Sequence, residues 1–117
     1  MNQMTNFARR IVNDEELEKA LDWLRDSAQQ MGKCKERLVK AQKMTDHTEA
    51  ILTLKSDQSS DTKRRADARA SARYLECIVE EAEAAGEFEK MKALREAAAL
   101  KIETWRSEQA NYRALKV

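Results

Sequence analysis

A regular spacing of apolar side chains marks the second half of the chain. From Tyr74 to Tyr112, residues recur at alternating steps of three and four for eleven consecutive steps. Nine of the twelve positions are apolar or aromatic, the set being Tyr74, Cys77, Glu81, Ala84, Phe88, Met91, Arg95, Ala98, Ile102, Trp105, Gln109 and Tyr112. A repeat of about 3.5 residues is typical of a helix that packs along a partner helix. This stretch therefore predicts one long, coiled-coil-like helix.

The first half carries a weaker stripe that begins after a helix-start signal. Asn13 is followed three residues later by Glu16, which resembles a capping box and predicts a helix from about 14 to about 55. The expected inward positions are Leu17, Leu21, Leu24, Ala28 and Met31, then Lys35, Leu38, Gln42, Thr45, Glu49 and Leu52. Around Cys34 the apolar positions become Cys34, Leu38, Ala41, Thr48 and Ile51. Such a shift is expected because a helix with about 3.6 residues per turn gradually rotates relative to a seven-residue repeat.

The expected connection between the two helices is the loop SDQSSD at residues 56–61. A second helix is then predicted from about 62 to about 115. We expect an all-α fold, an antiparallel helical hairpin of two long helices, as a single domain over 13–117 after an N-terminal arm at 1–12. A hairpin centred near residue 58 places Lys35 opposite Glu81 and Gly32 near Gly86, where a close helix approach would explain both glycines and where the helices can bend.

The composition favours exposed helices with a narrow buried seam. Charged residues make up 37% of the chain, aromatic residues 5%, proline is absent and there are two glycines. A two-helix protein of this length buries little area on its own. Trp23 lies beside the first stripe and widens the apolar face, so we expect a homodimer that forms a four-helix bundle.

The net charge of +1 hides a basic middle segment. Residues 33–73 carry eleven basic and six acidic groups. Within this segment, two sets of basic residues each share a helical face: Lys33, Arg37 and Lys40, and Arg65, Arg69 and Arg73. Like charges four residues apart destabilise a helix, so the row of Arg65, Arg69 and Arg73 implies a compensating anion. Salt bridges within or between subunits are the first interpretation, and a nucleic-acid phosphate backbone or an acidic protein partner are the alternatives.

No catalytic, cofactor or metal motif is present in the sequence. His47 is the only histidine, Cys34 and Cys77 form no CxxC pair, and no glycine-rich loop exists to bind phosphate. We therefore expect a protein that is not an enzyme and has no cofactor. The start of the chain lacks the apolar core of a signal peptide, and no run approaches the length of a membrane span, so a cytoplasmic protein is expected.

The C-terminal run IETWRSEQANYRA, together with ALREAAALKIE just before it, resembles small, all-helical, uncharacterised proteins of phages and prophages. The matching residues are Trp105, Arg106, Asn111 and Arg113, in about the last quarter of the chain. The resemblance implies a phage accessory gene of the recombination or replication type, acting in the cytoplasm of a bacterial host. It brings no catalytic residue. Arg106 and Arg113 share a face that is either a partner-binding surface or a solvated flank.

These observations lead to one functional hypothesis with two alternatives. The leading hypothesis is a non-enzymatic, phage-type accessory protein that binds another macromolecule, in phage DNA recombination or replication. The first alternative is an inhibitor of a host defence system, of the anti-restriction or anti-CRISPR type. The second is a coiled-coil structural or scaffold protein. A protein partner is expected in each case, nucleic acid is a candidate partner, and a membrane is not.

Overall fold

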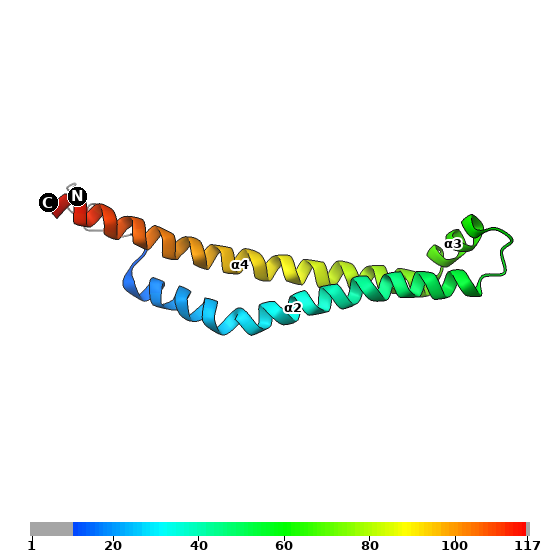
Figure 1. The fold of residues 1–117 in the computed structure, drawn as a ribbon. Coiled ribbons are helices and arrows are strands. Elements are labelled where there is room, and N and C mark those ends of the chain that lie inside the picture. The colour runs from blue at the N-terminus through cyan, green and yellow to red at the C-terminus, as the bar shows by residue number, and fades with distance from the viewer. Residues whose placement is uncertain (1–10, 117) are drawn as a thin grey trace. The chain divides into compact units, whose positions relative to one another are not determined.

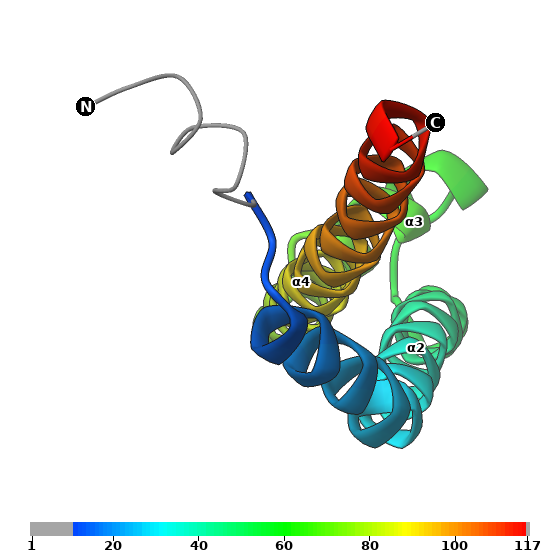
Figure 2. The ribbon, with the colours of Figure 1, turned by 90° about the vertical axis from the view of Figure 1, so that its left-hand side faces the viewer.

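The computed structural model describes residues 11–116, and all its regular elements in that range are helices (Figures 1 and 2). Helix α2 spans Asp14–Lys55, α3 spans Asp61–Arg69 and α4 spans Ala72–Lys116. The prediction of an all-α protein with two long helices is confirmed over this range. Residues 1–10 of the expected N-terminal arm lie outside the described residues.

Helix α2 begins at the predicted capping residue. The Asn13 side-chain oxygen accepts a hydrogen bond from the Glu16 amide at 2.8 Å, and the Asn13 carbonyl accepts one from the Leu17 amide at 3.0 Å. Three acidic residues follow in the first turn, where the positive end of the helix dipole favours them. The helix is continuous through Gly32, and no residue in the described range, glycine included, has a positive φ.

The single helix expected from about 62 to about 115 is divided in the structure. Helix α3 starts at the Ser60 cap, whose hydroxyl accepts from the Lys63 amide at 3.2 Å, and ends at Arg69. The Ser71 hydroxyl then accepts from the Tyr74 amide at 3.1 Å at the start of α4. Figure 1 shows α3 turned away from the line of α4. Ala70 keeps φ −84° and ψ −7°, so this break requires neither glycine nor proline.

Two compact units make up the described chain: residues 30–91 form one, and 11–29 with 92–116 form the other. In the unit 30–91, the core is a small cluster of Leu38, Ala41 and Ala84, against which Phe88 packs. The Thr45 hydroxyl donates to the Ala41 carbonyl at 3.0 Å and lies 3.4 Å from the Cys77 carbonyl. Small residues and satisfied hydroxyls therefore fill the contact between α2 and α4.

The register of the two helices in this unit differs from the expected one. Lys35 places its Nζ 5.0 Å from the centre of the Phe88 ring, and Thr45 lies against Cys77. The expected pairing of Lys35 with Glu81 is therefore wrong. The cause is the longer connection, because the chain between α2 and α4 includes all of α3 instead of a six-residue loop.

The close helix approach expected at the two glycines is also absent. A Cβ atom built on Gly32 or on Gly86 has no heavy atom within 4 Å beyond its own local backbone. Both residues are helical and exposed. Neither glycine is therefore required by packing within the described residues.

In the other unit, residues 11–29 run antiparallel to 92–116. The amides of Ile11 and Val12 each donate to the Glu108 carboxylate at 2.9 Å, and Val12 is only 4% exposed. Further along, Arg95 Nη1 donates to the Leu24 carbonyl at 2.8 Å and to the Ser27 hydroxyl at 2.6 Å. These contacts fix where the start of α2 lies along α4 in this unit.

The inward positions of α4 agree with the predicted stripe, whereas those of α2 agree only in part. Every stripe position from Tyr74 to Gln109 is buried or half-buried, and only Tyr112 is exposed. In α2, Leu21 is 50% exposed and Ala28 is exposed, while Ala20 and Ser27 are buried. The inward positions of α2 keep a 4-3 spacing and are Ala20, Leu24, Ser27, Met31, Cys34, Leu38, Ala41, Thr45, Thr48 and Leu52.

Candidate interaction surface

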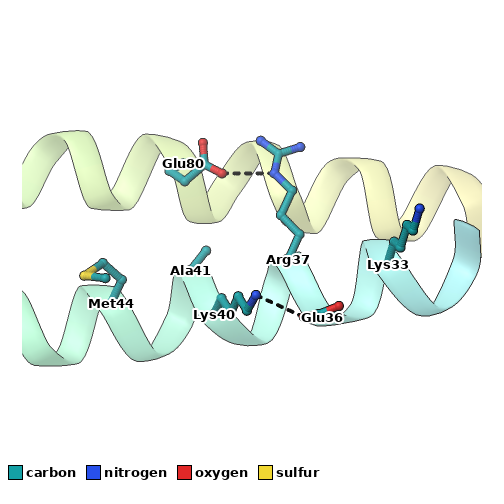
Figure 3. A pocket seen from close by; sticks show the side chains of 7 residues that line it. All are labelled: Lys33, Glu36, Arg37, Lys40, Ala41, Met44 and Glu80. Atoms are coloured by element: carbon teal, nitrogen blue, oxygen red, sulfur yellow. Dashed lines mark hydrogen bonds and ion pairs between the residues drawn. The ribbon is translucent and has the colours of Figure 1, made fainter.

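The three basic residues predicted on one face of α2 line an open groove between α2 and α4 in the unit 30–91 (Figure 3). The groove has a volume of about 440 Å³ and is lined by Lys33, Glu36, Arg37, Lys40, Ala41, Met44 and Glu80. Its α2 wall is basic and its α4 wall is acidic. Met44, which is 50% exposed, supplies the apolar part.

Arg37 connects the two walls. In Figure 3 its side chain reaches from α2 to Glu80 on α4, with Nε 3.0 Å from a carboxylate oxygen. Arg37 Nη1 also lies 3.2 Å from Glu87, and Nη2 lies 3.9 Å from Glu83. The hydrogen bond from Arg37 lowers the pKa of Glu80, and the same bond raises the pKa of Arg37. One guanidinium therefore faces three carboxylates, which leaves this side of α4 with excess negative charge.

The two lysines of this face are less engaged. Lys40 Nζ lies 3.0 Å from Glu36 on its own helix, and both side chains are well exposed (Figure 3). Lys33 is exposed and forms no ion pair with any residue in the described range. The α2 wall therefore keeps positive charge that no α4 carboxylate balances within the chain.

The second basic row lies on α3 and the start of α4, and each of its arginines pairs with a carboxylate of the same chain. Arg69 Nη2 is 3.1 Å from Glu49 and Arg65 Nε is 3.8 Å from the same oxygen. Arg73 pairs with Glu76 at 3.1 Å. The side chain of Glu49 is only 21% exposed, so the Glu49 carboxylate is the best shielded member of the cluster. Each guanidinium of the row is thus already partnered within the chain.

The predicted C-terminal pair is placed on the surface of α4. Arg106 forms an ion pair with Glu103 at 2.8 Å, one turn earlier, and Arg113 is exposed. Trp105, which belongs to the same sequence motif, donates from Nε1 to Asp14 at 3.1 Å and is half-buried. The structure therefore assigns Trp105 to packing and leaves the two arginines outside the seam.

Large apolar side chains are exposed outside the seam, a feature that the heptad pattern did not predict. In the unit 30–91, Leu75 is 60% exposed, Ile78 42% and Val79 48%, and Ile78 and Val79 lie three and four residues after Leu75 on α4. The signal was their i, i+3, i+4 spacing, because it places all three side chains on one helix face beside the main stripe. The larger exposed set is Ile11, Leu21, Trp23, Val39, Met44, Leu54, Leu75, Ile78, Val79, Leu94, Leu100, Tyr112 and Leu115.

A second groove lies in the other unit and is mostly apolar. It has a volume of about 320 Å³ and is lined by Glu16, Lys19, Ala20, Trp23, Leu94, Ala97, Ala98 and Lys101. Trp23, at 36% exposure, lies at this groove and not in the seam. The widening of the apolar face expected at Trp23 is thus visible as an exposed side chain beside exposed Leu94.

Within residues 11–116, no group of three or more His, Cys, Asp or Glu side chains is arranged to hold a metal ion. Over the same range no helix is long and apolar enough to cross a bilayer. The fold and its surfaces define a class, an all-α protein with two long helices and apolar side chains outside their seam. Comparisons with models of protein families, with curated proteins and with solved structures found no match to this chain.

Proposed function

We propose that this protein is not an enzyme and acts by binding another macromolecule, as a homodimer. In this proposal the two long helices form one antiparallel hairpin, and two hairpins form a four-helix bundle. The observation that carries the proposal is the exposure of large apolar side chains outside the seam, such as Leu75, Val79 and Met44. Exposed apolar groups that line helix faces are typical of surfaces that a partner covers.

The proposed setting is a phage accessory role in DNA recombination or replication, and it rests on the resemblance of the C-terminal quarter. A protein partner is favoured over direct DNA contact, because Arg65, Arg69 and Arg73 already face Glu49 and Glu76. A phosphate backbone would have to displace these carboxylates. Inhibition of a host defence system requires the same kind of protein-binding surface and is the second candidate.

Affinity capture with the full chain from infected and uninfected bacterial cells tests the proposal. We expect specific recovery of one protein, and loss of that recovery when Leu75 and Val79 are both changed to Glu. The double variant Glu89→Gln and Lys90→Gln, on the exposed surface of the same helix, serves as the control and should retain the partner. Recovery of no macromolecule under any condition would overturn the proposal.

A direct test of DNA binding separates the two kinds of partner. Single- and double-stranded DNA are titrated at low and at physiological salt with the wild type and with an Arg65→Gln, Arg69→Gln, Arg73→Gln variant. Because the three arginines are paired within the chain, we expect weak binding that the variant changes little. Tight, salt-sensitive binding that the variant abolishes would instead support a nucleic-acid partner.

A further inference from the structure

The groove of Lys33 to Met44 and Glu80 has walls of opposite charge, which makes it complementary to itself. The α2 wall carries Lys33 and Lys40, opposed in part by Glu36. On the α4 side, Glu80 lines the groove, and Glu83 and Glu87 lie beside it within 4 Å of the same Arg37, so three carboxylates share one guanidinium. One surface therefore carries both the positive and the negative charges that a second copy of the same surface needs in order to pair with it.

Resting on the homodimer of the proposed function, we propose that this groove is the dimer surface and that its occupant is the same groove of a second copy. The two copies face each other, related by a two-fold axis that runs along the groove. This rotation places α2 of one copy over α4 of the other, and the symmetry forms the contact twice. Basic residues of each copy then meet carboxylates of its partner.

The choice of axis follows from the charges. A two-fold axis lying across the groove would place α2 on α2 and bring Lys33 and Lys40 of both copies together. It would also set the glutamates of the two α4 helices against each other. Like charges at an interface disfavour such a pairing. The axis along the groove is the arrangement in which both walls find opposite charge.

The register within the unit indicates which residues meet. On either side of Lys40, Thr45 lies against Cys77 and Lys35 lies over Phe88. By this register Lys40 is level with Glu83, the carboxylate farthest from Arg37 at 3.9 Å. Rotation about an axis along the groove keeps each residue at its level. Lys40 of one copy therefore meets Glu83 of the other.

Met44 provides the apolar contact at one end of the groove. It lines the groove, it is 50% exposed, and Figure 3 shows it on the groove side of α2 beyond Ala41. Rotation about the same axis brings residue 44 of both copies to one level on opposite sides of the axis, so each Met44 lies over α4 of the other copy and the two side chains approach each other across the axis. Methionine adapts to such contacts because its side chain is flexible and polarisable. A short, charged surface of this kind is typical of a weak, salt-sensitive dimer.

Site-directed crosslinking tests the surface. The buried Cys34 and Cys77 are changed to Ala, and a single cysteine is introduced by Met44→Cys or, as the control, Val39→Cys. Val39 is exposed on α2 but does not line the groove. With a short bismaleimide we expect a covalent dimer from residue 44 at least tenfold more abundant than from residue 39. Equal yields, or no dimer from residue 44, would overturn the proposal.

Charge exchange gives an independent test by sedimentation equilibrium. Lys40→Glu is expected to weaken the dimer at least tenfold, and the double variant Lys40→Glu, Glu83→Lys to restore it. Lys43→Glu, exposed on the same helix outside the groove, is the matched control, and circular dichroism verifies that each variant is helical. Failure of the double variant to restore the dimer would exclude this surface. A wild-type dimer that crosslinks elsewhere would leave the proposed function standing and overturn only the assigned groove.

Discussion

At the residue scale, Arg37 is the most connected side chain of the groove. It is one guanidinium among three carboxylates, and it is partly exposed, so water and salt screen each ion pair. Its main effect is to offset repulsion among Glu80, Glu83 and Glu87 on one side of α4. Removing it leaves those carboxylates without their cation.

Arg37→Gln is therefore expected to lower the melting temperature slightly at low salt and to have little effect at high salt. Repulsion among carboxylates is strongest when the Debye length is long. Thermal unfolding followed by circular dichroism at two salt concentrations measures the difference. Lys43→Gln, which removes an exposed charge with no ion pair among the described residues, is the control. An Arg37→Gln effect that does not change with salt would contradict this account.

The Glu80 carboxylate gives a pH-dependent prediction. The hydrogen bond from Arg37 lowers the pKa of Glu80 below its ordinary value of 4.5. A folded-state pKa below the unfolded value stabilises the fold above that ordinary value, and this stabilisation is lost as pH falls through the folded-state pKa. We expect the stability difference between wild type and Glu80→Gln to be present at neutral pH and to disappear in acid. NMR titration should show the pKa of Glu80 rising in Arg37→Gln.

At the scale of the helices, packing does not explain why Gly32 and Gly86 are glycines. What remains is the conformational cost of placing glycine in a helix. Both lie in continuous helix, with no positive φ and with open space where a Cβ would stand. A helical glycine costs about 0.5–1 kcal/mol relative to alanine.

Gly32→Ala and Gly86→Ala are each expected to stabilise the protein by about 0.5–1 kcal/mol, and together by about the sum. Urea unfolding measures the change. Ala93→Gly, at an exposed position of α4, is the reverse control and should destabilise by a similar amount. A loss of stability in either alanine variant would show that a partner or a second subunit packs closely against the glycine.

The start of α4 depends on a serine that carries no obvious helix-breaking signal. Ser71→Ala removes the acceptor of the Tyr74 amide and is expected to cost about 1 kcal/mol. Because the loss falls on the first turn of α4, hydrogen exchange there should increase more than exchange near Ala84. Ser107→Ala, at an exposed mid-helix position, should leave exchange unchanged. Uniform acceleration along α4 would argue against a local cap.

The sequence predicted the helices more accurately than it predicted how α2 and α4 align along each other. The apolar period identified the inward face of α4 from Tyr74 to Gln109, and Asn13 marked the start of α2. Ser27 was overlooked in favour of Ala28, because its burial depends on a hydrogen bond from Arg95, 68 residues away. The break after Ala70 was missed for a similar reason, since it uses ordinary helical angles and a serine. Alignment depends on such contacts, which no local pattern records.

The basic candidates show the same limit at the site. Sequence spacing grouped Lys33, Arg37 and Lys40 on one face, and the structure places all three at one groove. The spacing could not show that the other row, Arg65 to Arg73, already faces Glu49 and Glu76. Apolar Leu75 and Val79 were passed over because a repeat beside the main stripe is hard to separate from it.

At the scale of the whole molecule, more large apolar side chains are exposed to water than are buried in the seam, among the described residues. No large side chain is fully buried among the described residues, and the buried set consists mainly of Ala, Cys, Ser and Thr. Such a seam contributes little hydrophobic stabilisation per residue. Association is the means by which a chain of this kind gains further stability.

The melting temperature is therefore expected to depend on protein concentration. If the folded state dimerises, mass action stabilises it, and a tenfold increase in concentration should raise the melting temperature by roughly 2–5 °C. Differential scanning calorimetry over a hundredfold concentration range measures this slope. Lys40→Glu should flatten it, whereas Lys43→Glu should not. A melting temperature independent of concentration would contradict dimerisation.

The hydrogen bonds of Arg95 have a consequence for how the chain selects one alignment. Two helices with heptad seams of small residues have degenerate alternatives, because a slide of seven residues again sets seam against seam. Arg95 meets Ser27 and the Leu24 carbonyl in one alignment only. A slide would bring its guanidinium against Ala20 or Cys34, which offer no comparable side-chain acceptor. The polar side chain of Arg95 thus favours one alignment of two repetitive helices over the others, although it packs less well in the seam than an apolar side chain would.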